Sequence, residues 1–108
     1  MIKITIKKKD SIIYGFTSSG HAEYAKSGKD IICAGVSAIV INTINSVEKF
    51  TNDQFKLDEQ QEMGKIIFDF IQSPSEKSQL LMDSMVLGLQ GIQQNYGKKY
   101  IILNFREV

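Results

Sequence analysis

Alternating apolar and polar residues open the chain and predict a β-hairpin. Isoleucine occupies positions 2, 4 and 6 with polar residues between them, and a period of two is typical of a strand with one buried face. The pair Asp10–Ser11 predicts a turn, after which Ile12, Tyr14 and Phe16 alternate again. Two such runs joined by a short turn predict a hairpin.

The alternation stops between Thr17 and Asp30, and we interpret this segment as a loop. It is rich in glycine and serine and has few large apolar side chains. It is longer than the usual connection of about 4–6 residues, and long loops in compact domains are often functional. It also holds His21, the only histidine of the chain.

A helical pattern begins after Asp30, which is a good N-cap, and ends near Phe50 to Asn52. The stripe that it predicts as buried consists of Ile32, Val36, Ile39, Val40, Thr43, Ile44 and Val47. No residue from Ile31 to Val47 is charged, but polar residues interrupt the run. A bilayer span needs about 20 mostly apolar residues, so we interpret the stretch as a buried helix. Ile41 widens the stripe, which favours either a dimer interface or burial within one subunit.

A second hairpin follows the helix. Phe55 and Leu57 alternate with charged residues, the segment from Glu59 to Gly64 predicts a turn, and apolar alternation resumes from Ile66 to Ile71. The sequence therefore predicts two more strands.

A second helix and a last strand complete the pattern. Ser73 fits the N-cap, Pro74 the first helical position and Glu76 the acid of a capping box. The predicted core stripe consists of Leu81, Met85, Leu89, Ile92 and Tyr96. Gly97 suits the C-terminal stop, and Tyr100 to Phe105 predicts the strand.

The element order is β-β-α-β-β-α-β, which predicts an α+β fold. Two helices would cover one face of a mostly antiparallel or mixed five-stranded sheet, and the other face would stay more exposed. The length of 108 residues fits one domain, residues 1–108.

Composition narrows the range of functions. A net charge of +1 gives no reason to expect a nucleic acid or an anionic membrane as partner. One cysteine cannot form an internal disulfide, and the first residues lack the apolar core of a signal peptide, so we expect a cytoplasmic protein. One histidine and one cysteine do not make a metal site, and there is no glycine-rich phosphate loop, so we expect no metal and no cofactor.

The only cysteine, Cys33, has a position suited to nucleophilic chemistry. If Asp30 is the N-cap, Cys33 is the third helical residue, where unpaired backbone N–H groups and the helix dipole favour a thiolate. The same N–H groups could stabilise an oxyanion. His21 lies twelve residues earlier, and a loop of this length can fold it back over the helix start, where it could exchange a proton with the thiol and with a leaving amine. Asp30 competes for these donors, so we expect it to support the helix start or orient His21.

Two other interpretations of Cys33 remain open at this point. Free cysteine is among the most buried residue types, so Cys33 could be a packing residue. It could also be a redox-sensing thiol that forms a sulfenic acid. Spacing alone does not decide, because Cys–His pairs have no fixed sequence separation.

The stretch from Gly20 to Ser37 resembles the signature of the ribosomal-processing cysteine protease family, Prp. The matching residues are Gly20-His21-Ala22, then Gly28 and Asp30, then Ile31-Ile32, Cys33-Ala34 and Val36-Ser37. The length, the initial hairpin, the acidic middle hairpin and the glycine-containing second helix fit the family as well. Gly35 is a departure, since alanine is more usual there.

The resemblance implies a cysteine endopeptidase that removes the short N-terminal extension of a large-subunit ribosomal protein precursor, cutting after aromatic residues. It implies a homodimer that needs no metal, with no membrane and no direct nucleic acid required. Cys33 would be the nucleophile and His21 the general base and acid. Asp30, Ser37 and Ala34 would be supporting residues, and Gly20 and Gly28 would let the loop bend. The alternative is a non-enzymatic ribosome- or RNA-associated binding module in which Cys33 is packing.

Overall fold

The computed structural model describes residues 1–20, 31–60, 62 and 64–108. Its elements follow the predicted order: β1 (Ile2–Lys9), β2 (Ile12–Gly20), α1 (Ile31–Phe50), β3 (Phe55–Gln60), β4 (Lys65–Phe70), α2 (Glu76–Tyr96) and β5 (Ile101–Glu107). The strands form one sheet in the order β3-β4-β2-β1-β5. All neighbours are antiparallel except β1 and β5, which are parallel, so the sheet is mixed.

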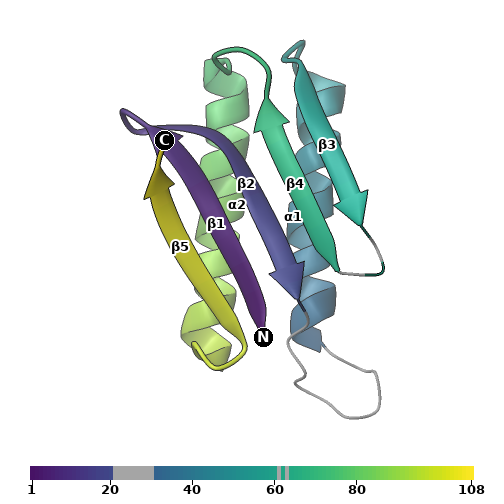
Figure 1. Cartoon of the computed structure of the whole chain (residues 1–108), viewed down its shortest axis with the longest axis vertical. Helices are drawn as coiled ribbons and strands as arrows, with labels where there is room; N and C mark the ends of the chain where they lie inside the picture. The colour runs from purple at the N-terminus through teal and green to yellow at the C-terminus, as the bar shows by residue number, and fades with distance from the viewer. Residues whose placement is uncertain (21–30, 61, 63) are drawn as a thin grey trace.

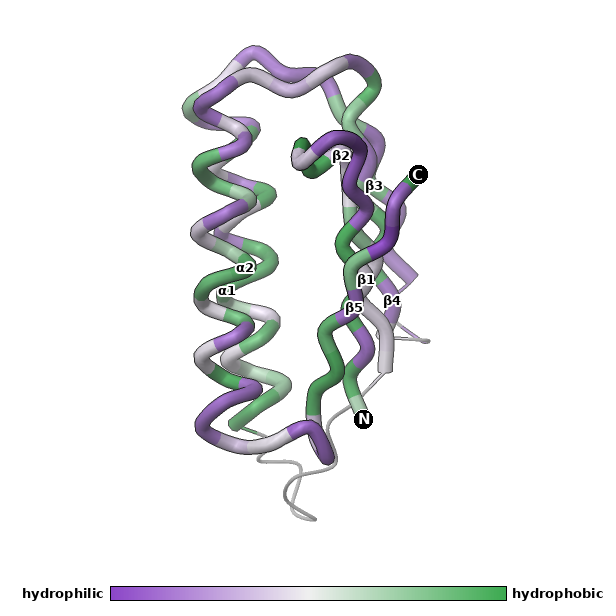
Figure 2. The backbone as a smooth tube through the Cα atoms, turned by 90° about the vertical axis from the view of Figure 1, so that its left-hand side faces the viewer, coloured by the Kyte–Doolittle hydropathy of each residue, from purple (hydrophilic) through white to green (hydrophobic). Residues whose placement is uncertain are grey.

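The two helices lie side by side on one face of the sheet (Figure 1). Seen from the side, the helices make one layer and the strands another, and the far face of the sheet has no helix on it (Figure 2). The predicted two-layer α+β fold is therefore confirmed.

The core lies between these layers, where the alternation of β1 places its isoleucines. Ile4 and Ile6 are fully buried, as are Phe16 of β2 and Phe68 of β4. The Phe68 ring stacks on Phe16 with 5.2 Å between centroids and on Phe55 of β3 with 4.7 Å. Aromatic pairs of this kind contribute about 0.5–1.5 kcal/mol each beyond their buried area. The Phe68 ring therefore ties three strands together at the centre of the core.

The helices run antiparallel and approach closely where a glycine faces an isoleucine. A Cβ atom on Gly88 would lie 3.1 Å from Cδ1 of Ile39, so a larger residue there would require the Ile39 side chain to shift. By length and composition alone α1 could cross a membrane, as core helices also can. Its predicted stripe is buried except for the half-buried Ile39, which packs against the core. The predicted buried stripe is therefore confirmed, whereas the other side of α1, which includes Ile41, is exposed.

Two predicted boundaries are wrong because strands continue through polar residues. Thr17–Gly20 was expected in the loop but belongs to β2, where Ser18 pairs with Ile4 on one side and Ile66 on the other. Glu59 was expected in a turn but lies in β3, where it pairs with Ile66. Backbone pairing on both sides holds β2 in register even where its inward side chain is only a serine.

The second helix also differs from its prediction at both ends. Its N-cap is Ser75 rather than Ser73, since the Ser75 hydroxyl accepts a hydrogen bond from the backbone N–H of Ser78. At the other end Tyr96 is 42% exposed and not part of the core. Met82, outside the predicted stripe, is fully buried instead.

Asp53, in the segment between α1 and β3, fixes the start of α2. Its Oδ2 accepts hydrogen bonds from the Ser75 backbone N–H at 3.0 Å, from the Ser75 hydroxyl at 2.6 Å and from the Ser78 hydroxyl. Burial raises the pKa of the Asp53 carboxyl, but the hydrogen bonds from Ser75 and Ser78 outweigh it, so the pKa lies below its ordinary value of 3.8. The ionised carboxylate therefore stabilises the fold.

We expect Asp53→Asn to lower the free energy of unfolding by about 1–2 kcal/mol at neutral pH, because charge-assisted hydrogen bonds are lost. The folded-state pKa is lowered, so the contribution is present above the unfolded-state pKa and disappears as pH falls through the folded-state pKa. Urea unfolding at neutral and at acidic pH measures this. The control Asp83→Asn removes an exposed carboxylate of α2 and should change stability by less than about 0.5 kcal/mol. Equal stability of Asp53→Asn and wild type at neutral pH would contradict the assignment.

Candidate active site

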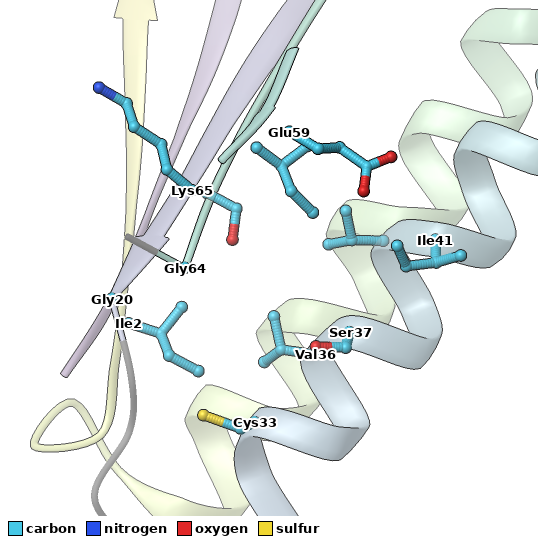
Figure 3. Close-up of a pocket in the computed structure, with 12 residues that line it drawn as sticks. Ile2, Gly20, Cys33, Val36, Ser37, Ile41, Glu59, Gly64 and Lys65 are labelled. Atoms are coloured by element: carbon cyan, nitrogen blue, oxygen red, sulfur yellow. The ribbon is translucent and has the colours of Figure 1, made fainter. Parts of the chain in front are cut away.

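A cavity of about 280 Å³ lies between the N-terminal half of α1 and the adjoining ends of β2, β3 and β4 (Figure 3). On the helix side it is lined by Cys33, Ser37 and Ile41. These residues are four apart and therefore lie on one face of α1, one turn above another. The sequence spacing alone thus places a thiol, a hydroxyl and an apolar side chain in a row along one wall.

The opposite wall is a single row of the sheet. Ser18, Ile66 and Glu59 are cross-strand partners on β2, β4 and β3, and all three line the cavity. Side chains of directly paired residues project to the same face, which is the face covered by the helices. None of the three was predicted as a site residue, because the sequence pattern placed Ser18 in a loop, Glu59 in a turn and Ile66 simply in a strand.

Cys33 is the third residue of α1 and is half-buried. Figure 3 shows its sulfur directed from the helix toward the sheet side of the cavity. Backbone N–H groups of a first helical turn have no partner within the helix, and the helix dipole places partial positive charge there. The first turn of α1 holds no acidic residue. In general, such a position can favour a thiolate and serve an oxyanion, which is the role predicted for Cys33.

Gly20 ends β2 at the same cavity, in a conformation that favours glycine. Its φ is +93°, and a Cβ atom there would lie 2.3 Å from the carbonyl oxygen of Met1. Its backbone N–H donates to the carbonyl of Gly64 at 3.2 Å, which joins β2 to the turn before β4. Gly20 is therefore the point at which the chain leaves the sheet toward His21.

The structure describes only some of the predicted site residues. Cys33 and Ser37 line the cavity together with Gly20, and Ala34 is exposed in the first turn of α1. His21, Gly28 and Asp30 lie outside the described residues. The pairing of His21 with Cys33 and the N-cap role of Asp30 therefore remain predictions.

Comparison with known families decides the class of protein. A family model described as "Cysteine protease Prp" matches residues 1–101. The chain belongs to the Prp family of cysteine proteases. The ribosomal processing cysteine protease Prp of Bacillus subtilis (strain 168) is 35% identical over 101 residues, which cover 89% of this chain and 90% of that one. The corresponding protein of Staphylococcus aureus (strain NCTC 8325 / PS 47) is 28% identical over 87 residues, or 81% of each chain.

Solved Prp structures have the same fold. The crystal structure of the S. aureus ribosomal processing protease Prp with a covalently linked product peptide has a TM-score of 0.92 and 26% identity, and covers 98% of this chain and 100% of that one. The same protease in complex with a substrate peptide has a TM-score of 0.87 and 25% identity, with the same coverage. The chain is thus a Prp-type cysteine protease, and the predicted enzyme class is confirmed.

Gly20→Ala tests whether this corner of the Prp fold requires glycine. The substitution should lower the free energy of unfolding by about 1–3 kcal/mol through backbone strain, with an additional loss from the clash with Met1. The measurement is thermal or urea unfolding of the purified variant. The control is Gly91→Ala on α2, where a Cβ atom meets nothing within 4 Å and the helix should gain about 0.5–1 kcal/mol. A Gly20→Ala variant as stable as wild type would show that the corner tolerates a side chain.

Proposed function

We propose that this protein is an endopeptidase that removes the short N-terminal extension of a large-subunit ribosomal protein precursor, cutting after aromatic residues in the cytoplasm. The observation that carries the proposal is the match to the Prp family over residues 1–101, with Cys33 facing the cavity at the start of α1. The names of the relatives refer to ribosomal processing, and the peptide complexes of the S. aureus protease support a peptide substrate.

The chemistry begins with attack of the Cys33 thiolate on the carbonyl carbon of the scissile bond. We expect first-turn N–H groups of α1 to stabilise the oxyanion that forms, with Ala34, the residue after Cys33, in the same turn. The C–N bond then breaks, and the His21 imidazolium gives its proton to the leaving amine. The product of this step is a thioester on Cys33 and a free, shortened ribosomal protein.

Water completes the cycle. Neutral His21 takes a proton from the water as it attacks the thioester, the C–S bond breaks, and the thiolate leaves paired with the imidazolium. Asp30 orients His21 or supports the helix start, and the Ser37 hydroxyl lies one turn along α1 from Cys33. Gly20 and Gly28 allow the segment between them to adjust to the peptide.

Cys33→Ala should reduce cleavage of a peptide carrying the precursor's extension by at least about a thousand-fold, because the nucleophile is absent. Mass spectrometry of the products gives both the rate and the cut position. Circular dichroism should show an unchanged fold. The matched control Ser37→Ala removes a polar group from the same wall and should retain measurable cleavage. If peptide and full-length precursor both stay intact with the wild-type protein, the rival interpretation as a binding module would replace this one.

We also propose that the protein is a homodimer that associates through the outer side of its helix layer. Leu80 and Leu87 of α2 are 70% and 71% exposed, and they lie two turns apart on one side of the helix. Exposed apolar side chains gathered on one face are typical of an association surface.

Leu87→Glu should convert the dimer to a monomer, because it places a charge in the proposed interface. Light scattering after size-exclusion chromatography at several protein concentrations measures the mass. Asn104→Glu adds the same charge on an exposed position of β5 and should leave the dimer intact. A monomeric wild-type protein, or an intact Leu87→Glu dimer, would contradict the proposed interface.

A further inference from the structure

Glu59 is the acidic side chain that the described sheet wall presents to the cavity. It lines the cavity from β3, opposite Ile41 of α1. Lys65 also lines the cavity, but Figure 3 shows its side chain directed away and its carbonyl oxygen directed inward, whereas the Glu59 carboxylate extends toward α1. Strand alternation explains the difference, because Lys65 and Ile66 are successive residues and project to opposite faces.

The charge of Glu59 is not neutralised within the described part of the chain. The ion pair found there joins Lys7 to Asp69. Both of these residues lie on the uncovered face of the sheet, away from the cavity. No hydrogen bond to the Glu59 carboxylate occurs among the described residues either. The neighbouring side chains are the apolar Ile41 and Ile66 and the hydroxyls of Ser18 and Ser37. The carboxylate is therefore available to a group that enters the cavity.

Glu59 lies at the opposite end of the cavity from Cys33. Cys33 and Ile41 are separated by eight helical residues, which correspond to about 12 Å at 1.5 Å per residue. Figure 3 shows Glu59 near the Ile41 end. An extended peptide rises about 3.3 Å per residue. A substrate whose scissile carbonyl is at Cys33 would thus bring a side chain three to five residues away to the Glu59 carboxylate.

We propose that Glu59 is a specificity-determining residue that binds a lysine or arginine side chain of the peptide substrate, about four residues from the scissile bond. The inference rests on the proposed protease function. Among the described residues, the other side chains directed into the cavity are uncharged, so the Glu59 carboxylate can attract an ammonium or guanidinium group, accept hydrogen bonds from it and repel an acidic side chain. Glu59 acts on substrate binding and takes no part in bond cleavage.

The test is a set of otherwise identical peptides that carry lysine, glutamine or glutamate at one position. That position is three, four or five residues from the scissile bond, on either side. The wild-type protein should prefer lysine to glutamate at one of these positions by about ten-fold in kcat/KM, mainly through KM, and less at high salt. Glu59→Gln should abolish the preference, and Glu59→Lys should reverse it.

Asp58→Asn is the matched control. Asp58 precedes Glu59 in β3 and projects to the uncovered face of the sheet. The Asp58→Asn variant loses the same amount of charge as Glu59→Gln but retains Glu59, so it should keep the preference for lysine. If the preference for lysine depends on residue 59 and not on residue 58, it arises from contact with the substrate rather than from the net charge of the protein.

Binding measurements make the test independent of cleavage. Fluorescence anisotropy with the Cys33→Ala protein, alone and combined with Glu59→Gln, compares the lysine and glutamate peptides directly. A preference that persists in Glu59→Gln, or the absence of any preference in wild type, would overturn the role of Glu59. If the protein cleaves the peptide carrying the precursor's extension but shows no such preference, the proposed protease function is still supported. Failure to cleave any peptide or the full-length precursor would overturn the protease function. The binding comparison would still test whether Glu59 determines the preference for lysine.

Discussion

The cavity beside Cys33 exists because the side chains that hold the two layers apart become smaller along one strand. The inward row of β2 runs from Phe16 through Ser18 to Gly20. Phe16 fills the space beneath the helices and stacks on Phe68, whereas Ser18 and Gly20 fill little of it. The stacked phenylalanines keep the helices at their distance from the sheet, so the space above Ser18 and Gly20 stays open. Cys33 thus lies where the small residues Ser18 and Gly20 leave space between the two layers.

Opposite ends of α1 meet different requirements. Its first turn places Cys33 at the cavity, while its middle approaches α2 closely where Ile39 faces Gly88. Beyond its last turn, Asp53 caps the start of α2 through Ser75 and Ser78. The helix is thereby anchored away from the chemistry. Its N-terminal end also contributes to the core, because Ile32 and Val36 are buried there on either side of Cys33.

The sequence predicts the elements of this fold well where periodicity is strong. The isoleucines of β1 and the apolar stripe of α1 are buried as expected, because each presents one continuous face to the core. Prediction fails where backbone pairing rather than side-chain pattern sets the structure. Ser18 and Glu59 belong to strands because neighbouring strands pair with them, and local composition carries no sign of this. Of the described cavity lining, only Cys33, Ser37 and Gly20 could therefore be anticipated, through the motif to which they belong.

The parallel pairing of β1 with β5 has a consequence for the order in which the chain folds. Ile2 pairs with Ile101, so contacts of the first strand span nearly the whole sequence. Contacts of such long range slow folding, because the chain must close a large loop before they form. During synthesis β1 can pair with β2 early, but its other edge stays open until β5 has left the ribosome. An unpaired strand edge can pair with other chains. The newly made protein is therefore prone to aggregation until β5 pairs with β1 and completes the sheet.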